Sequence, residues 1–137
     1  MKLTTKFNIL IFFFALIINS CQSNSQQSST KKIVDLTPTA FKEAITRENT
    51  VILDVRTPKE VSQGVIPGAK VINFYDDNFK TALGKLDKNK TYLVYCKSGG
   101  RSGKACKALE DVGITNYHNL DGGITAWKKA GQETVQQ

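Results

Sequence analysis

The chain is 137 residues long and carries 19 Lys and Arg against 12 Asp and Glu, a formal net charge of +7. This length allows one ordinary compact domain but not two, and 10 glycines, 3 prolines and 3 cysteines exclude a collagen-like chain, a disordered chain and a disulfide scaffold. Because the positive charge is moderate and forms no long basic run, we expect an anionic small molecule or a membrane surface as partner, and no nucleic acid.

The N-terminal segment predicts an export signal rather than part of a fold. Lys2 and Lys6 precede an apolar run at 7–18, interrupted only by Asn8. The run is shorter than the roughly 20 residues of a bilayer-spanning helix and fits the apolar core of a secretory signal. It ends in Ile18-Asn19-Ser20-Cys21, a pattern that resembles the lipobox of bacterial lipoproteins. We therefore expect a lipoprotein signal peptide at 1–20 and lipidation at Cys21.

A polar tether is expected to follow the lipidated cysteine. Residues 22–30 contain only Gln, Ser, Asn and Thr, which cannot bury enough apolar surface to offset the loss of chain entropy. Residues 21–31 would then link a domain at 32–137 to a membrane through the lipid, in the bacterial cell envelope and outside the cytoplasm. The alternatives are an uncleaved anchor, or ordinary cleavage that leaves Cys21 as a plain thiol.

Residues 32–137 predict strands that alternate with helices. Apolar and β-branched runs predict strands at 33–36, 51–55, 70–74, 91–96 and 117–120. Helices are expected from Pro38 after a Thr37 cap, from Pro58 to the glycine at 64, and at 76–83, 102–112 and 124–130. Such alternation implies an α/β domain whose largely parallel sheet is covered by helices on both faces. Ligands of such sheets bind beyond the carboxyl ends of the strands.

The loop after the fourth expected strand carries the most chemical information. It reads Cys96-Lys97-Ser98-Gly99-Gly100-Arg101-Ser102, and a helix is expected directly after it. Gly99 and Gly100 can take positive φ, which turns consecutive backbone N–H groups toward one centre. The helix N-terminus adds partial positive charge there, and Lys97 and Arg101 add full charges. A thiol at Cys96 should therefore titrate below its free value, which makes it the candidate nucleophile with the rest of the loop as its anion-binding frame.

Neither Cys106 nor His118 predicts a second reactive site. Cys96 could be an ordinary buried strand-end cysteine, but the glycines, cations and helix that follow favour the nucleophile. Cys106 lies on the inner stripe of the helix at 102–112 and is expected to be a packed core thiol without a disulfide to Cys96. The sole histidine, His118, is not placed for a Cys–His pair. No clustered ligands predict a metal, and no cofactor is expected.

Four segments in order carry a family resemblance. They are Leu53-Asp54-Val55-Arg56 with Glu60, then Gly64-Val65-Ile66-Pro67-Gly68-Ala69, then the loop from Cys96 to Arg101, and finally Asp121-Gly122-Gly123-Ile124-Thr125-Ala126-Trp127. With this order and spacing, the chain resembles a single-domain rhodanese, a thiosulfate-type sulfurtransferase, over residues 33–131. The resemblance implies a mostly parallel five-stranded sheet with an active loop that begins at the cysteine.

The resemblance also implies sulfur transfer through a persulfide. The Cys96 thiolate would take the outer sulfur of an anionic donor such as thiosulfate. It would then pass the sulfur to cyanide, a thiol or a protein cysteine. Lys97 and Arg101 would attract the anionic donor, and Arg101 would also brace the loop.

Scaffold roles follow from the same resemblance. Arg56 and Glu60 would pair with each other, and Asp54 would hold the end of its strand near the site. Family members usually carry a histidine where this chain has Val65, which puts one hydrogen bond to the loop in question.

Two other functions stay open on the same scaffold. A phosphatase or arsenate reductase would hold a tetrahedral oxyanion in a Cys-x-x-x-x-x-Arg loop, whereas four residues separate Cys96 from Arg101 here. A non-catalytic module would present an anion pocket or a surface to an envelope partner. Such domains often lose the cysteine, and this chain keeps it.

Overall fold

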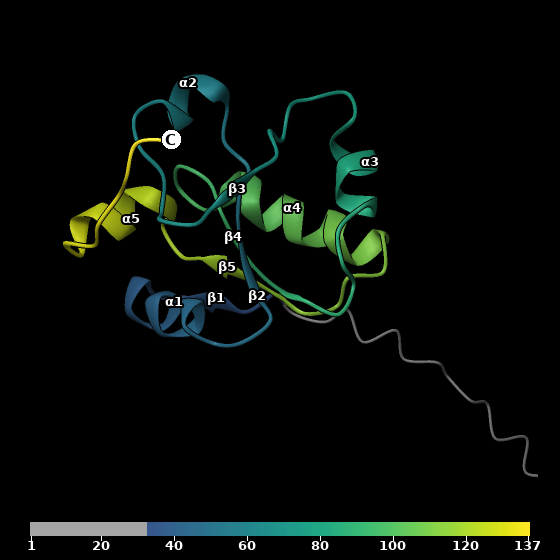
Figure 1. Cartoon of the computed structure of the whole chain (residues 1–137), viewed down its shortest axis with the longest axis horizontal. Coiled ribbons are helices and arrows are strands. Elements are labelled where there is room, and N and C mark those ends of the chain that lie inside the picture. Colours follow the sequence, from purple (N-terminus) through teal and green to yellow (C-terminus); the bar gives the residue numbers. More distant parts are fainter. Residues whose placement is uncertain (1–32) are drawn as a thin grey trace, which may run out of the picture. The chain divides into compact units, whose positions relative to one another are not determined.

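The computed structural model describes residues 33–137, so the expected signal peptide, the lipidation site at Cys21 and the tether lie outside the described residues. The described part forms a five-stranded sheet with the order β1-β5-β4-β2-β3, and every strand pair is parallel (Figure 1). The strands are β1 (Asp35–Leu36), β2 (Thr50–Asp54), β3 (Lys70–Val71), β4 (Thr91–Tyr95) and β5 (Tyr117–Leu120). The predicted α/β class and the parallel sheet are confirmed.

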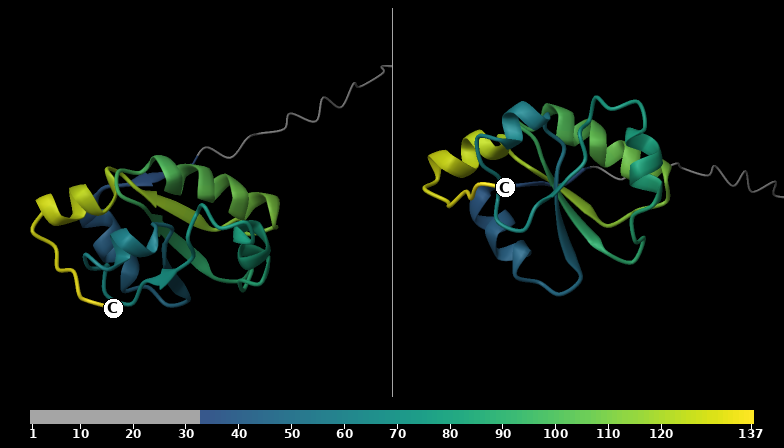
Figure 2. Two further views of the ribbon diagram at one scale, coloured as in Figure 1. Left: turned by 90° about the horizontal axis from the view of Figure 1, so that it is seen from above. Right: turned by 45° about the horizontal axis from the view of Figure 1, so that its top comes forward.

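Helices cover both faces of this sheet (Figure 2). They are α1 (Pro38–Ile45), α2 (Pro58–Val61), α3 (Phe79–Gly84), α4 (Gly100–Asp111) and α5 (Gly123–Lys129). One core cluster joins residues of α3 and α4, such as Leu83 and Leu109, to β2 and β4. The other cluster lies on the opposite face and joins Phe41 of α1 to Trp127 of α5, whose rings pack edge to face with centroids 6.0 Å apart. Within residues 33–137, no helix combines the length and the apolar composition needed to cross a bilayer.

The first two helices begin where local sequence chemistry predicts. The Thr37 hydroxyl accepts a hydrogen bond from the N–H of Ala40 at 3.3 Å, directly before the proline that opens α1. At α2, the Thr57 hydroxyl accepts the N–H of Glu60, and the Glu60 carboxylate accepts the N–H of Thr57. This reciprocal capping box satisfies two donors that a helix N-terminus otherwise leaves open. It also fixes the Glu60 side chain, which matters at the site described below.

The segment after β3 departs from the expected elements. The strand expected at 70–74 ends at Val71, and the helix expected at 76–83 begins only at Phe79. The N–H groups of Ile72 and Phe74 still donate to the carbonyls of Asp54 and Val55. The Asn73 side chain forms a local turn there, because its amide donates to Asp76 at 2.6 Å while its carbonyl accepts the N–H of Tyr75 at 3.2 Å. This local turn competes with both strand and helix geometry.

The two central strands bring the chemically unusual segments to one edge of the sheet. β2 and β4 pair over their whole length, from Thr50 opposite Thr91 to Asp54 opposite Tyr95. The residues that follow these strands, among them Arg56 and Cys96, therefore leave the sheet at the same end. β5 ends at the same edge and leads into the glycine turn before α5, so three loops converge where parallel sheets usually bind ligands.

Candidate active site

The Cys96 sulfur lies inside the loop that connects β4 to α4. Its Sγ accepts a hydrogen bond from the backbone N–H of Gly99 at 3.1 Å, and the Ser102 hydroxyl lies 3.4 Å from it. Gly99 adopts φ +98°, a left-handed conformation that glycine takes without strain, and the residue caps α4. The side chain of Cys96 is nearly inaccessible, at 1% exposure, yet its sulfur faces hydrogen-bond donors.

This environment holds the pKa of Cys96 below its ordinary value. Burial acts in the opposite direction and raises the pKa, because it disfavours the charged thiolate. Hydrogen bonds to the sulfur lower the pKa by more than burial raises it. They come from the Ser102 hydroxyl and from the backbone N–H groups of Ser102, Ser98 and Gly99. The thiolate is the nucleophilic form of cysteine, so the loop favours the reactive form of this sulfur.

The N-terminal end of α5 holds the first half of the loop. The N–H of Ile124 donates to the carbonyl of Cys96 at 2.9 Å. The N–H and the hydroxyl of Thr125 donate to the carbonyl of Lys97 at 3.1 and 2.9 Å. Gly123 makes this approach possible, since a Cβ at its position would lie 2.5 Å from the Cys96 carbonyl oxygen. α5 therefore fixes the carbonyls of Cys96 and Lys97 on the side of the loop away from the sulfur, and the N–H groups of the loop face the sulfur.

A second contact fixes the carbonyl of Gly99. The Asn119 amide on β5 donates to this carbonyl at 3.3 Å and to the Asp35 carboxylate at 2.8 Å. The Ser102 hydroxyl also lies 3.1 Å from the Gly99 carbonyl, so its single proton can be donated either to that oxygen or to the Cys96 sulfur. Gly99, whose N–H bonds the sulfur, is thereby anchored to the sheet through its carbonyl.

The far end of the loop is braced by an ion pair. Arg101 donates to both carboxylate oxygens of Glu60, at 2.8 and 2.6 Å, and its guanidinium lies 5.6 Å from the Tyr75 ring centroid. The Arg101 hydrogen bonds are the main cause that lowers the pKa of Glu60 to about 2, with further lowering by Thr57 and an opposing effect of burial. The predicted bracing role of Arg101 agrees with this geometry.

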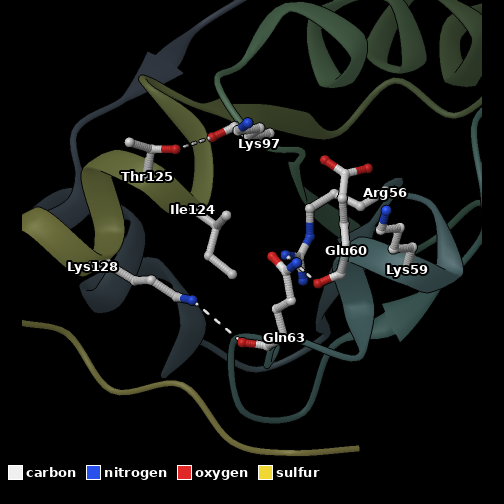
Figure 3. Close-up of a pocket in the computed structure, with 8 residues that line it drawn as sticks. All are labelled: Arg56, Lys59, Glu60, Gln63, Lys97, Ile124, Thr125 and Lys128. Carbon is white, nitrogen blue, oxygen red and sulfur yellow. Dashed lines mark hydrogen bonds between the residues drawn. The ribbon is translucent and has the colours of Figure 1, made fainter.

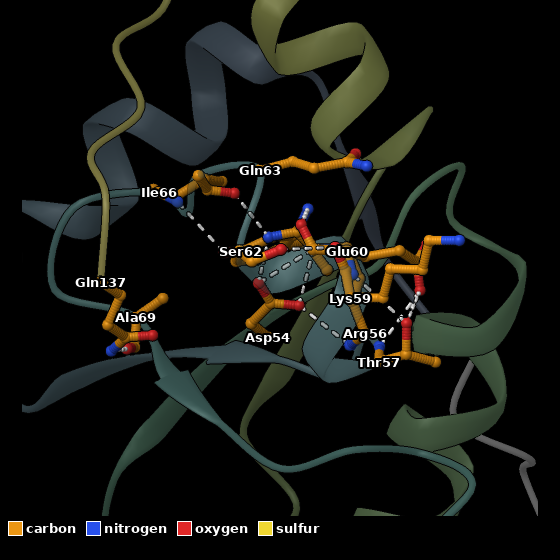
Figure 4. A network of polar contacts seen from close by, with 12 residues as sticks. Asp54, Arg56, Thr57, Lys59, Glu60, Ser62, Gln63, Ile66, Ala69 and Gln137 are labelled. Atoms are coloured by element: carbon orange, nitrogen blue, oxygen red, sulfur yellow. Dashed lines mark hydrogen bonds and ion pairs between the residues drawn. The ribbon is translucent and has the colours of Figure 1, made fainter.

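The predicted pairing of Arg56 with the Glu60 carboxylate is wrong. Arg56 is 3% exposed and pairs with the fully buried Asp54, with Nη2 2.6 Å from Oδ2 and Nε 2.9 Å from Oδ1 (Figure 4). Its remaining hydrogen bonds go to the backbone carbonyls of Glu60 at 3.1 Å and Gly64 at 2.8 Å. Arg56 points inward, where it meets Asp54, while the Glu60 carboxylate faces Arg101. The Asp54–Arg56 pair ties the end of β2 to α2 and serves as scaffold.

Three other predicted features take definite places in the structure. Gly100 begins α4, so of the two loop glycines that can take positive φ only Gly99 does so. Cys106 is fully buried, and burial is the main cause that raises the pKa of its thiol to about 12, as expected for a core thiol. Val65 is buried in the core, and its backbone pairs with Val135 through hydrogen bonds of 2.8 and 2.9 Å. The Val65 side chain is therefore part of the core.

A pocket of about 340 Å³ borders the loop (Figure 3). Its lining residues come from the loop after β2, from α2, from the Cys96 loop and from α5: Arg56, Lys59, Glu60, Gln63, Lys97, Ile124, Thr125 and Lys128. Cys96 itself does not line this pocket, so the space lies beside the sulfur. Of the loop residues, Lys97 presents an exposed side chain to it.

Two residues that position the loop are absent from the sequence-based site. Gly123 belongs to a glycine pair in which both members adopt positive φ, +69° at Gly122 and +59° at Gly123. Two adjacent glycines after a predicted strand are a signal for such a close backbone contact, although they do not identify what is contacted. Asn119 gives a weaker signal, a single polar residue near the end of a buried strand.

The position of the Ser102 proton is testable by the reactivity of Cys96. In a Ser102→Ala protein, one donor to the sulfur is lost, so we expect the pKa of Cys96 to rise and the pH profile of its alkylation by iodoacetamide to move to higher pH. Alkylation at neutral pH should slow, because the thiolate fraction falls. The matched control is Ser98→Ala, since Ser98 acts on the sulfur only through its backbone N–H. An unchanged profile in Ser102→Ala would show that the hydroxyl donates to Gly99 instead.

Comparison with known proteins adds a family match to this geometry. A family model described as the rhodanese-like domain matches residues 37–130. A sulfurtransferase from Allochromatium vinosum is 36% identical over 88 residues, which cover 64% of this chain and 80% of that protein. A thiosulfate sulfurtransferase from Pseudoalteromonas translucida is 28% identical over 95 residues, covering 69% and 89% of the two chains. The crystal structure of a rhodanese-like domain protein from Staphylococcus aureus is similar with a TM-score of 0.66 and 33% identity, over 77% of this chain and 99% of that one.

Proposed function

This chain belongs to the rhodanese-like domain family, and from that premise we propose that it is a sulfurtransferase that carries sulfane sulfur as a Cys96 persulfide. The observation that supports this most strongly is the arrangement of donors around one buried sulfur: the N–H groups of the loop and the Ser102 hydroxyl lower the pKa of Cys96. Such donors stabilise a thiolate before reaction. They also stabilise the negative charge that a persulfide carries on its terminal sulfur.

The proposed reaction has two displacement steps. The Cys96 thiolate attacks the outer sulfur of thiosulfate, the S–S bond of the donor breaks, and sulfite leaves with the bonding electron pair. Cys96 then carries the transferred sulfur as a persulfide. In the second step, cyanide or a thiolate attacks the terminal sulfur, and the Cys96 thiolate leaves and is ready for another cycle.

The cations of the loop divide between two roles in this proposal. Arg101 is engaged by Glu60 at 2.6 Å, so its charge is largely compensated and it serves to hold the loop. Lys97 is exposed and forms no ion pair in the described part of the chain. Lys97 is therefore the loop cation that attracts an anionic donor.

The same geometry disfavours a phosphatase or arsenate reductase. In such a site an arginine would face the oxyanion above the cysteine, whereas the Arg101 guanidinium contacts Glu60 and Tyr75. The loop is also one residue shorter than the Cys-x-x-x-x-x-Arg pattern. A non-catalytic module would have no need of the donors that hold the pKa of Cys96 low.

A turnover assay separates these three functions. We expect sulfite release from thiosulfate that depends on cyanide or a thiol, with the parallel-line kinetics of a ping-pong mechanism. Phosphate ester hydrolysis and thiol-dependent arsenate reduction are the competing activities. Turnover of either one without sulfite release would overturn the proposal in favour of that enzyme class. No turnover with any of the three substrates would favour the non-catalytic module.

The location of the protein is a separate proposal that depends on its first 31 residues. The apolar run, the lipobox-like stretch and the polar tether support a protein anchored by lipid at Cys21 in the bacterial cell envelope. Metabolic labelling with palmitate should mark the wild-type protein and leave a Cys21→Ala protein unmarked. An unlabelled wild-type protein would contradict the lipid anchor without affecting the sulfur chemistry.

A further inference from the structure

The pocket beside the active loop has an uncompensated positive charge. Four of its lining residues are cations and one is an acid. Arg56 is neutralised by Asp54, and the acid, Glu60, is neutralised by Arg101. The three remaining cations are Lys59, Lys97 and Lys128, which are exposed and form no ion pair with any residue in the range 33–137.

These lysines approach the pocket from three different elements. Lys59 lies on α2, Lys97 in the Cys96 loop and Lys128 on α5, and all three line the pocket drawn in Figure 3. The Lys128 ammonium donates to the backbone carbonyl of Gln63 at 3.4 Å, a contact that places it near the rim without neutralising it. Convergence of separate elements produces a field focused on one space, which attracts anions.

The pocket adjoins the loop that holds the sulfur. Ile124 and Thr125 line it and donate their N–H groups to the carbonyls of Cys96 and Lys97. Glu60 lines it and holds Arg101 at the far end of the loop. A molecule in this pocket therefore lies against the outer surface of the loop. Its volume of about 340 Å³ is within the range for small organic ligands, so it offers more room than an inorganic sulfur donor needs.

We infer that this pocket binds the anionic group of a small organic thiol, so that the protein prefers acceptors with a carboxylate or phosphate over neutral ones. The inference rests on the proposed sulfur transfer and specifies its acceptor. Lys59 and Lys128 hold the anionic group while the thiol extends along the loop to the terminal sulfur of the persulfide. The thiolate attacks that sulfur, the S–S bond to Cys96 breaks, and the acceptor leaves as a persulfide.

The first test compares two acceptors that differ only in charge. The Cys96 persulfide is formed with thiosulfate in the intact protein, freed of donor, and mixed with mercaptopropionate or with the neutral mercaptopropanol of the same chain length. For a Lys59→Ala/Lys128→Ala protein, we expect the second-order rate with mercaptopropionate to fall about three- to tenfold at low ionic strength, the size of effect expected from two exposed charge contacts. The rate with mercaptopropanol should stay within about twofold, and high salt should remove most of the difference.

A matched control uses lysines outside the pocket. Lys85→Ala/Lys129→Ala removes the same net charge from exposed positions, one of them adjacent to Lys128, and should leave the mercaptopropionate rate within about twofold of wild type. An equal loss in both double variants would show that overall charge, and no specific pocket, attracts the acceptor. Equal rates for the two acceptors with wild-type protein would also overturn the inference.

A binding measurement separates failure of this inference from failure of the proposed function. The S-methyl ether of mercaptopropionate cannot accept sulfur, and its titration into nitrogen-15-labelled protein should shift the amide signals of Gln63, Thr125 and Lys128. If these shifts occur but the protein forms no persulfide when it is treated with thiosulfate, the sulfurtransferase proposal is contradicted and the anion pocket is supported. Persulfide formation without these shifts would overturn the pocket and leave the sulfurtransferase standing.

Discussion

A Cys96→Ser protein is expected to lose sulfur transfer to the background level, a decrease of at least about a thousandfold. The pKa of a serine hydroxyl is too high for the loop to hold it as an anion, and serine cannot form the S–S bond on which the proposed cycle depends. The loop should survive the change, because the donors around the sulfur can also bond a hydroxyl oxygen. Sulfite release from thiosulfate in the presence of cyanide measures the loss, and circular dichroism checks that the fold is retained.

Cys106→Ser is the matched control for this variant. Cys106 is fully buried among apolar side chains, and its pKa of about 12 makes it a poor nucleophile. We expect most of the activity to remain, with a stability loss of about 1–3 kcal/mol from burying an unsatisfied hydroxyl. Equal activity losses in the two folded variants would show that the roles of the thiols are reversed.

Gly123→Ala is expected to have the second largest effect. An added Cβ would lie 2.5 Å from the carbonyl oxygen of Cys96 and 2.6 Å from the carbonyl oxygen of Lys97, so loop and helix must move apart. That movement breaks the hydrogen bond from Ile124 to Cys96 and turns the loop N–H groups away from the sulfur. We expect sulfur transfer to fall more than about tenfold, since small misplacements at a reacting centre reduce rates steeply.

Gly131→Ala separates the steric clash from the cost of the backbone conformation. Gly131 also adopts positive φ, +72°, but a Cβ at its position would meet nothing within 4 Å. Both variants should lose about 1–2 kcal/mol of unfolding free energy from a non-glycine residue in the left-handed region, and only Gly123→Ala should lose activity. Thermal denaturation and the sulfite assay measure the two effects. Full activity in Gly123→Ala would mean that α5 does not position the loop.

The elements and the position of the nucleophile could be predicted because their signals are local. Thr37 and Thr57 are helix caps followed by proline, and both helices begin there. The strand at 117–120 and the inner face of α4 follow from the pattern of apolar residues, which also placed Cys106 in the core. Cys96 followed by glycine, cations and a helix predicted a thiol surrounded by backbone donors, and the geometry at Gly99 has this form.

The tertiary contacts of the site could not be read from these patterns. Whether Glu60 meets Arg56 or Arg101 depends on which way each side chain points, and α2 turns the Glu60 carboxylate toward the loop. The contact of α5 with the loop depends on a close approach between Gly123 and Cys96, which are 27 residues apart, and periodicity does not encode such an approach. β3 ends at Val71, and the side chain of Asn73 bonds its own neighbours, a turn that the apolar residues at 72 and 74 do not reveal in the sequence.

Intact mass spectrometry after thiosulfate treatment tests the central claim most directly. With excess donor removed, the wild-type protein should gain the mass of one sulfur atom, located on the peptide that contains Cys96 and released by cyanide. Cys96→Ser should gain nothing. A wild-type protein that stays unmodified by any sulfane donor, or that carries the sulfur on Cys106, would contradict the assignment of the Cys96 loop as a persulfide site.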